Sequence, residues 1–130
     1  MASTSATVRS FALPKINDKH ATPIWRLEVE YERFLFYNYT IGAYLRATEA
    51  IYDLLTAYPK KTMPADFLTP DIEDWATKRM ERLSESSVRR EVAHIHAFFK
   101  WMWYAKGIEV QNPAVVIRLN NKTSAPRLTY

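Results

Sequence analysis

Several residue types that define common protein classes are missing or scarce in this chain. None of its 130 residues is a cysteine, which excludes a disulfide framework, a thiol nucleophile and a cysteine-ligated metal. Its two glycines are too few for a turn-rich all-β fold. No apolar run approaches the roughly 20 residues of a membrane span, and the first residues lack a secretory signal. We therefore expect a helical protein of the cytoplasm.

The net charge of +4 is concentrated at the two ends of the sequence. Residues 1–21 carry three basic side chains and one acid, and residues 118–130 carry three basic side chains and no acid. Residues 22–117 have 12 basic and 13 acidic side chains. Net charge therefore does not predict nucleic-acid binding by the folded part, and a basic surface there requires segregation of charge.

The pattern of apolar residues divides the chain into a helical domain and two tails. Residues 1–21 show no sustained periodicity and predict a flexible N-terminal arm. Residues 120–130 are polar and basic, as is typical of a linker. The segment between them, residues 22–119, predicts one all-α domain, a compact bundle of four main helices.

Proline follows a threonine at the expected start of two helices. Thr22-Pro23 and Thr69-Pro70 each predict an N-cap residue with proline in the first helical position. The helix that starts at Thr22 runs to about Asn38. The helix that starts at Thr69 ends in basic residues, which the helix dipole explains as well as a ligand would. These bases are Lys78, Arg79 and Arg82.

Hydroxyl side chains and a glycine delimit the other two helices. Thr40 predicts the N-cap of a helix over about 40–57. The serines within 84–87 offer caps for the longest helix, about 87–106. Gly107 ends that helix, and a last helical or extended piece follows it.

Helical periodicity predicts which apolar side chains face inward. The 22–38 helix is apolar on two sides, since Trp25, Val29 and Phe36 lie nearly opposite its main stripe. That second side is either buried within the domain or kept for a partner. The expected inward residues of the four helices are, in chain order, Leu27, Tyr31, Phe34 and Leu35; Ile41, Tyr44, Leu45, Thr48, Ile51, Tyr52 and Leu55; Ile72, Trp75, Ala76 and Leu83; Val88, Val92, Ile95, Phe99, Met102 and Trp103.

Residues that could carry catalysis do not form a recognisable site. His94 and His96 are two positions apart on a helix, so they point away from each other and do not share a metal. No Gly-x-Ser-x-Gly turn and no phosphate-cradling glycine loop is present. We expect this chain to have no enzymatic activity, no metal and no cofactor.

The 87–106 helix carries the most informative surface. Its side away from the core collects cations, alanines and a tyrosine with no acid, flanked by His94 and His96: Arg89, Arg90, Ala93, Ala97, Lys100 and Tyr104. Alanines let a helix approach a DNA groove, while Arg and Lys reach phosphates and guanine edges. A solvated face explains such a strip equally well. The 40–57 helix shows the pattern more faintly, with an outward face of Gly42, Ala43, Arg46, Ala47 and Ala50.

The order of these motifs resembles the core-binding domain of the tyrosine recombinases, or phage integrases. Leu68–Trp75 is similar to the family's threonine-x-aspartate-isoleucine passage, and Leu83–Trp101 to its serine-x-x-threonine-valine-x-arginine opening and the phenylalanine-phenylalanine-x-tryptophan that follows. Asn112-Pro113-Ala114 matches the ending of that domain, and Pro126–Thr129 the start of the catalytic domain.

The resemblance implies a SAM-like helical domain that clamps duplex DNA through the 40–57 and 87–106 helices. It implies DNA contacts by Thr40, Arg46, Ser86, Ser87, Arg89, Arg90 and Lys100, with Lys60 and Lys61 as weaker candidates. The family's catalytic residues belong to the following domain, and Tyr130 matches none of them. We therefore expect a fragment or excised domain, whose partners are double-stranded DNA, the parent's own catalytic domain and further copies that contact its first helix.

Two other classes of function compete with this interpretation. A helical protein–protein interaction module without DNA binding is suggested by the Trp25, Val29 and Phe36 side of the first helix and by Trp101, expected near the outer rim. An autonomous helix-turn-helix regulator is the weaker alternative, because no short glycine-containing turn joins the last two helices.

Overall fold

A computed structural model describes residues 22–115, 117 and 119 of the chain. The predicted arm, 1–21, and linker, 120–130, lie outside the described residues. Within the described part there are helices and no strands, which confirms the all-α prediction. The helices are α1 (Ile24–Asn38), α2 (Ile41–Ala57), α3 (Thr69–Arg79) and α4 (Glu85–Lys106), with a 3-10 helix, η2 (Pro64–Asp66), before α3.

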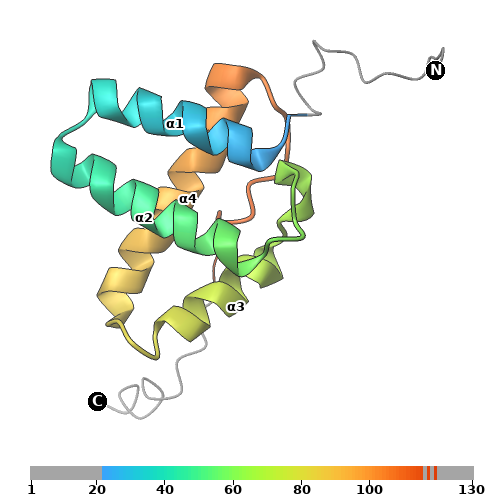
Figure 1. Cartoon of the computed structure of the whole chain (residues 1–130). Helices are drawn as coiled ribbons and strands as arrows, with labels where there is room; N and C mark the ends of the chain where they lie inside the picture. The colour runs from blue at the N-terminus through green and yellow to red at the C-terminus, as the bar shows by residue number, and fades with distance from the viewer. Residues whose placement is uncertain (1–21, 116, 118, 120–130) are drawn as a thin grey trace.

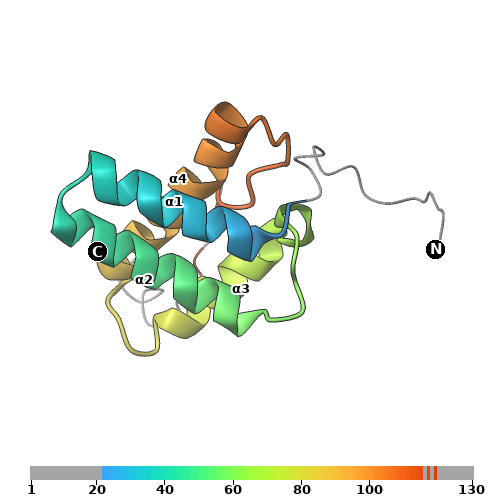
Figure 2. The ribbon, with the colours of Figure 1, turned by 45° about the horizontal axis from the view of Figure 1, so that its top comes forward.

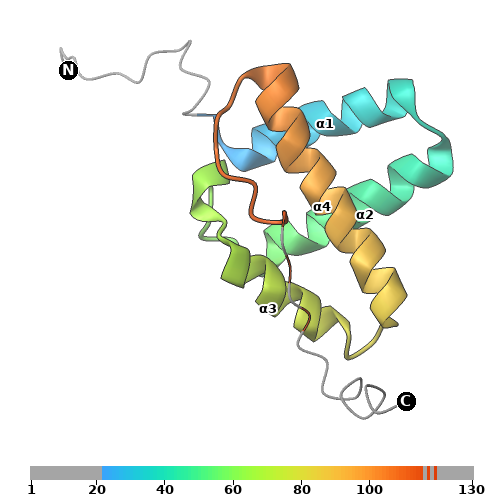
Figure 3. The same ribbon diagram turned by 180° about the vertical axis from the view of Figure 1, so that it is seen from behind.

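Helices α1 and α2 lie side by side and run in opposite directions, joined by a short turn (Figure 1). Helix α4 crosses both of them on one face, as the view from behind shows (Figure 3). Helix α3 packs against α2 and α4, and the turned view places it beside the C-terminal half of α2 (Figure 2). One apolar core fills the space among the four helices.

The two threonine–proline pairs start their helices differently from the prediction. Pro23 is the N-cap of α1 rather than its first residue, with φ −62° and ψ 148°, and its carbonyl accepts a hydrogen bond from the Leu27 amide at 3.2 Å. Thr69 lies inside α3, whose N-cap is Leu68. The Asp71 carboxylate accepts the Leu68 amide at 2.8 Å. A carboxylate in the first turn therefore replaces the expected hydroxyl cap.

The predicted capping residues of α2 and α4 are confirmed. Thr40 caps α2, since its Oγ1 accepts the Ala43 amide at 3.2 Å. Ser84 caps α4 by accepting the Ser87 amide at 3.2 Å, so the helix begins two residues before the predicted start. Gly107 ends α4 with φ 69°, a left-handed conformation that glycine adopts without steric cost.

The buried face of α2 differs from the predicted stripe. Ala47 and Ala50 are buried, with Ala50 fully inaccessible at 0 %, whereas Ile41, Leu45 and Tyr52 are exposed. Helix α4 packs across α2, and small side chains suit such packing because they let two helix backbones approach closely. Two residues of the predicted close-approach face of α2, Ala47 and Ala50, are therefore used inside the protein and are not available to a ligand, whereas Arg46 of that face is exposed.

The buried face of α4 includes the predicted Val88, Val92, Ile95, Phe99 and Met102, but it is wider than predicted on one side. Phe98 and Trp101 are buried, and Trp103 is 52 % exposed. Helix α1 covers this side, since the Trp101 ring lies 5.0 Å from that of Tyr31 and 6.1 Å from that of Phe34. The expectation that Trp101 lies on the outer rim is wrong.

The residues after α4 form an extended segment held against the helix. Ile108 and Ala114 are buried. The Asn112 Nδ2 donates to the His96 carbonyl at 3.0 Å, and its Oδ1 accepts the Ala114 amide at 3.0 Å. One asparagine therefore fastens the segment to α4 and shapes the turn that follows.

Among the described residues, one acid, Glu28 of α1, lies in the core. Glu28 is 3 % exposed, and its Oε2 has no hydrogen-bond partner among the described residues. Burial, a hydrogen bond to Glu32 and the charge of Glu32 raise the pKa of Glu28 from 4.5 to about 8. The folded chain therefore keeps a proton on Glu28 at a pH where the unfolded chain has released it.

We expect the stability of the protein to fall as the pH rises from about 4.5 to about 8, because folding takes up a proton in that range. Glu28→Gln should remove this slope and stabilise the protein at pH 8, since glutamine stays neutral. Urea unfolding followed by circular dichroism at several pH values measures both effects.

The matched control is Glu81→Gln, at an exposed position after α3, which should retain the wild-type slope. Equal slopes in wild type and Glu28→Gln would contradict the assignment of the proton to Glu28.

Candidate nucleic-acid interface

The outward face of α4 matches the predicted strip. All six of its residues are exposed: Arg89, Arg90, Ala93, Ala97, Lys100 and Tyr104. We call this surface the α4 strip; it lies on the helix that crosses in front of the others in Figure 3. His94 and His96 are half-buried along its two edges, as the helical spacing predicts.

The cations of the α4 strip differ in how they are paired. Arg89 forms an ion pair with Glu85 one turn earlier, with Nη2 2.8 Å from Oε2. Among the described residues, Arg90 and Lys100 have no ion-pair partner within 4.0 Å. An exposed pair such as Arg89–Glu85 contributes little and exchanges readily for a stronger anion.

An open hollow lies between α2, α3 and α4, next to one edge of the strip. Its volume is about 270 Å³. It brings together three of the predicted contact residues, Arg46, Ser87 and Arg90, and adds His94. We call it the α2–α4 hollow; its other lining residues are Glu49, Arg79, Leu83 and Glu91.

Arg79 neutralises the acids beside this hollow. Its Nε and Nη2 donate to the two carboxylate oxygens of Glu91 at 2.9 and 2.7 Å, and its Nη1 lies 3.3 Å from Asp53 Oδ1. The guanidinium also lies over the Trp75 ring, whose Nε1 donates to Asp53 at 2.8 Å. Arg79 is therefore a structural residue that joins three helices, and the helix-dipole explanation of this base is incomplete.

The electrostatics of the hollow act on His94. Burial and the positive charge of Arg46 lower the pKa of His94 from 6.5, while Glu91 opposes them. Hydrogen bonding to Glu91 raises the pKa of Arg79 against the effect of burial. At neutral pH the hollow therefore presents the fixed charges of its arginines beside a neutral imidazole.

Arg46 lies along its own helix above Gly42. A Cβ added at Gly42 would lie 3.3 Å from the Arg46 Nη1. The glycine thus leaves room for the guanidinium close to the surface of α2. Gly42 is thus half-buried beside Arg46 rather than part of a bare docking face.

The other predicted contact residues lie elsewhere or have structural partners. The hydroxyl of Thr40 caps α2, and the Ser86 Oγ lies 3.2 Å from the Ser84 Oγ. Lys61 pairs with Asp71 at 3.2 Å and donates to the Asp66 carbonyl at 2.9 Å. Lys61 therefore holds the loop before α3, and neither Thr40 nor Ser86 lines the hollow.

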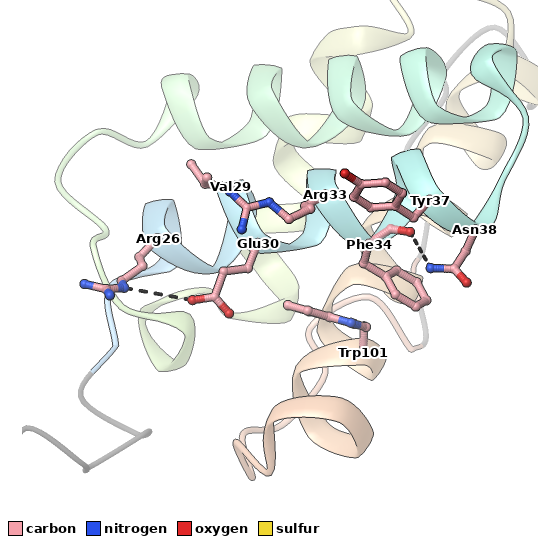
Figure 4. Close-up of a pocket in the computed structure, with 8 residues that line it drawn as sticks. All are labelled: Arg26, Val29, Glu30, Arg33, Phe34, Tyr37, Asn38 and Trp101. Atoms are coloured by element: carbon pink, nitrogen blue, oxygen red, sulfur yellow. Dashed lines mark hydrogen bonds and ion pairs between the residues drawn. The ribbon is translucent and has the colours of Figure 1, made fainter.

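A second surface lies along α1. It includes Val29, which the sequence analysis assigned to a protein-binding side of this helix. Figure 4 shows a wide groove of about 820 Å³ between α1 and Trp101 of α4. Val29 is 56 % exposed there, and Arg26 lies 3.9 Å from Glu30. We call it the α1 groove; its remaining lining residues are Arg33, Phe34, Tyr37 and Asn38.

The second apolar side of α1 is partly packed against α2 and partly exposed. Trp25 packs edge-on against Tyr52 at 5.6 Å, and Phe36 against Tyr44 at 5.7 Å. These contacts fasten α1 to α2. Val29 and Tyr37 remain exposed at the α1 groove.

In comparisons with known proteins, the chain matches no family model, no curated protein and no solved structure. A search of the described helices for a segment long and apolar enough to cross a bilayer finds none.

We expect Arg79→Met to destabilise the protein by about 3 kcal/mol or more, because it leaves two partly buried carboxylates without their cation. The Arg79 side chain is 11 % exposed, so water cannot replace it fully. Urea unfolding at neutral pH measures the loss.

Arg82→Met removes the same charge from an exposed position just after α3 and should change stability by less than about 0.5 kcal/mol. Similar losses for the two variants would contradict the role assigned to Arg79.

Proposed function

We propose that this chain binds duplex DNA as the core-binding domain of a site-specific tyrosine recombinase. The observation that carries the proposal is the adjacency of two cationic features, the α4 strip and the α2–α4 hollow. The order of motifs along the sequence supports the choice of family. In this proposal the chain holds DNA, and strand exchange belongs to the parent's catalytic domain.

The α4 strip suits contact with a duplex for a steric and an electrostatic reason. Ala93 and Ala97 are exposed and small, so the helix backbone can come close to a groove. Arg90 and Lys100 flank them, and cations at the rim of a groove contact phosphates. Arg46 extends this surface onto α2. In this proposal α2 contributes one arginine to DNA binding, and not a face of small residues.

A protein-interaction module is the second candidate, favoured by the α1 groove. Phe34 and Trp101 lie at one edge of the groove and Val29 and Tyr37 at the other (Figure 4). Val29 and Tyr37 are exposed there, and exposed apolar side chains in a concave surface are typical of sites that bind proteins. The two functions use different faces of α1 and α4, so one chain can have both.

We expect weak duplex binding, with a Kd on the order of 10⁻⁴ to 10⁻⁶ M at physiological salt, as for non-specific electrostatic contacts. Arg90→Ala combined with Lys100→Ala should lower the slope of log affinity against log salt by about 2, since each lost phosphate contact removes about 0.9. Fluorescence anisotropy with a labelled duplex at several salt concentrations measures the slope.

The charge-matched control is Lys78→Ala combined with Arg82→Ala, two exposed positions, the first in the last turn of α3 and the second just after that helix. This control should keep the wild-type slope. If it loses the slope while the α4 variant keeps it, the duplex lies on α3 and the assignment of the α4 strip is wrong. Absence of wild-type binding even at low salt would favour the interaction module.

A further inference from the structure

The α2–α4 hollow has the charge arrangement of a seat for one anion. Arg46 and Arg90 reach it from two different helices, and within the described part of the chain neither forms an ion pair. Two arginines that line one hollow, with no acid in an ion pair to either of them, are an unfavourable arrangement that a bound anion relieves. The chemistry that fits is an oxyanion that accepts hydrogen bonds from two guanidinium groups, as a phosphate does.

The acids around the hollow compete little for these arginines. Glu91 of α4 is engaged by two hydrogen bonds from Arg79 of α3. Asp53 of α2, just outside the hollow, is held by Arg79 and by Trp75. Glu49 of α2 is the remaining acid that faces the hollow, and it is exposed. Among the described residues, the hollow is therefore lined by two arginines without an ion-pair partner, Arg46 and Arg90, against one remaining acid, Glu49.

His94 adds a group whose charge depends on pH. It is half-buried and lines the hollow from α4 beside Arg46. Burial and Arg46 lower its pKa from 6.5, and Glu91 acts in the opposite direction. A phosphate in the hollow would counter Arg46 and favour the imidazolium, so binding and protonation must strengthen each other.

We propose that Arg46, Arg90 and His94 together seat one phosphate of the DNA backbone, and that His94 takes up a proton when the seat is filled. This inference rests on the proposed DNA binding. It makes the affinity of the domain for a duplex depend on pH: affinity rises as the pH falls, by at most tenfold per pH unit for one linked proton. A neutral imidazole still donates one hydrogen bond, so binding weakens at high pH without being abolished.

The test measures duplex affinity of the full chain between about pH 5 and 8 at constant ionic strength, in wild type and two variants. Wild type should bind several-fold more tightly at the acidic end. His94→Gln should bind with an affinity that no longer changes in this range, because glutamine keeps a hydrogen-bond donor without titrating. His96→Gln is the matched control, since His96 lines a different hollow beside Ala114, and it should keep the wild-type profile.

Proton NMR of the histidine rings in wild type tests the same claim without a substitution. The His94 titration should move to higher pH on adding the duplex, while that of His96 stays in place. Inorganic phosphate serves as the second probe, and a smaller shift with phosphate alone supports a seat for the phosphate group itself.

The outcomes separate the inference from the function on which it rests. Duplex binding that is equally tight at every pH, or an unmoved His94 titration, overturns the proton-linked seat and leaves DNA binding intact. A His94 shift with inorganic phosphate but no duplex binding overturns DNA binding and restricts the seat to free anions. A pH dependence that survives in His94→Gln assigns the proton to another group and overturns the role of His94.

Discussion

The guanidinium of Arg79 determines both how the helices meet and which charges stay available at the surface. It forms two hydrogen bonds with Glu91 of α4 and an ion pair with Asp53 of α2, and it lies over Trp75 of its own helix. One planar cation thereby orients α3 against two neighbours. By engaging Glu91 and Asp53, it also removes the acids that would otherwise neutralise Arg46 and Arg90.

The packing of α2 against α4 is the second condition for the proposed interface. Helix α2 packs against α4, and two small residues of α2, Ala47 and Ala50, are buried. The close crossing brings Arg46 of α2 beside His94 of α4. The two alanines therefore contribute to the packing inside the protein, and Arg46 and His94 contribute to the surface of the hollow.

Much of the fold was predictable because its signals are local. The cap at Thr40 and the glycine stop at Gly107 involve neighbouring residues only, and both are confirmed. The buried faces of α2 and α4 were less predictable. A periodic pattern identifies the widest apolar stripe of a helix, but the neighbour that crosses it decides which part is covered. For this reason Ala50 is buried while Ile41 and Trp103 are exposed.

In the candidate site, too, the features within one helix were predictable and those that join several helices were not. The α4 strip was predictable because its residues share one face of a single helix. The α2–α4 hollow was not, since it joins Arg46, Arg79 and His94 from three helices. The pairing of Arg79 with Asp53 and Glu91 gives no signal in one sequence, because these residues are far apart along the chain. The role of Asn112 was indicated only by its place in a resembling motif.

Backbone amide NMR with and without a short duplex tests the central claim most directly, because it reports on every face of the protein at once. The account predicts the largest shift changes along the α4 strip and around Arg46, Ser87 and His94, with small changes in the α1 groove. The largest changes around Val29, Phe34 and Trp101, or none at all, would contradict it.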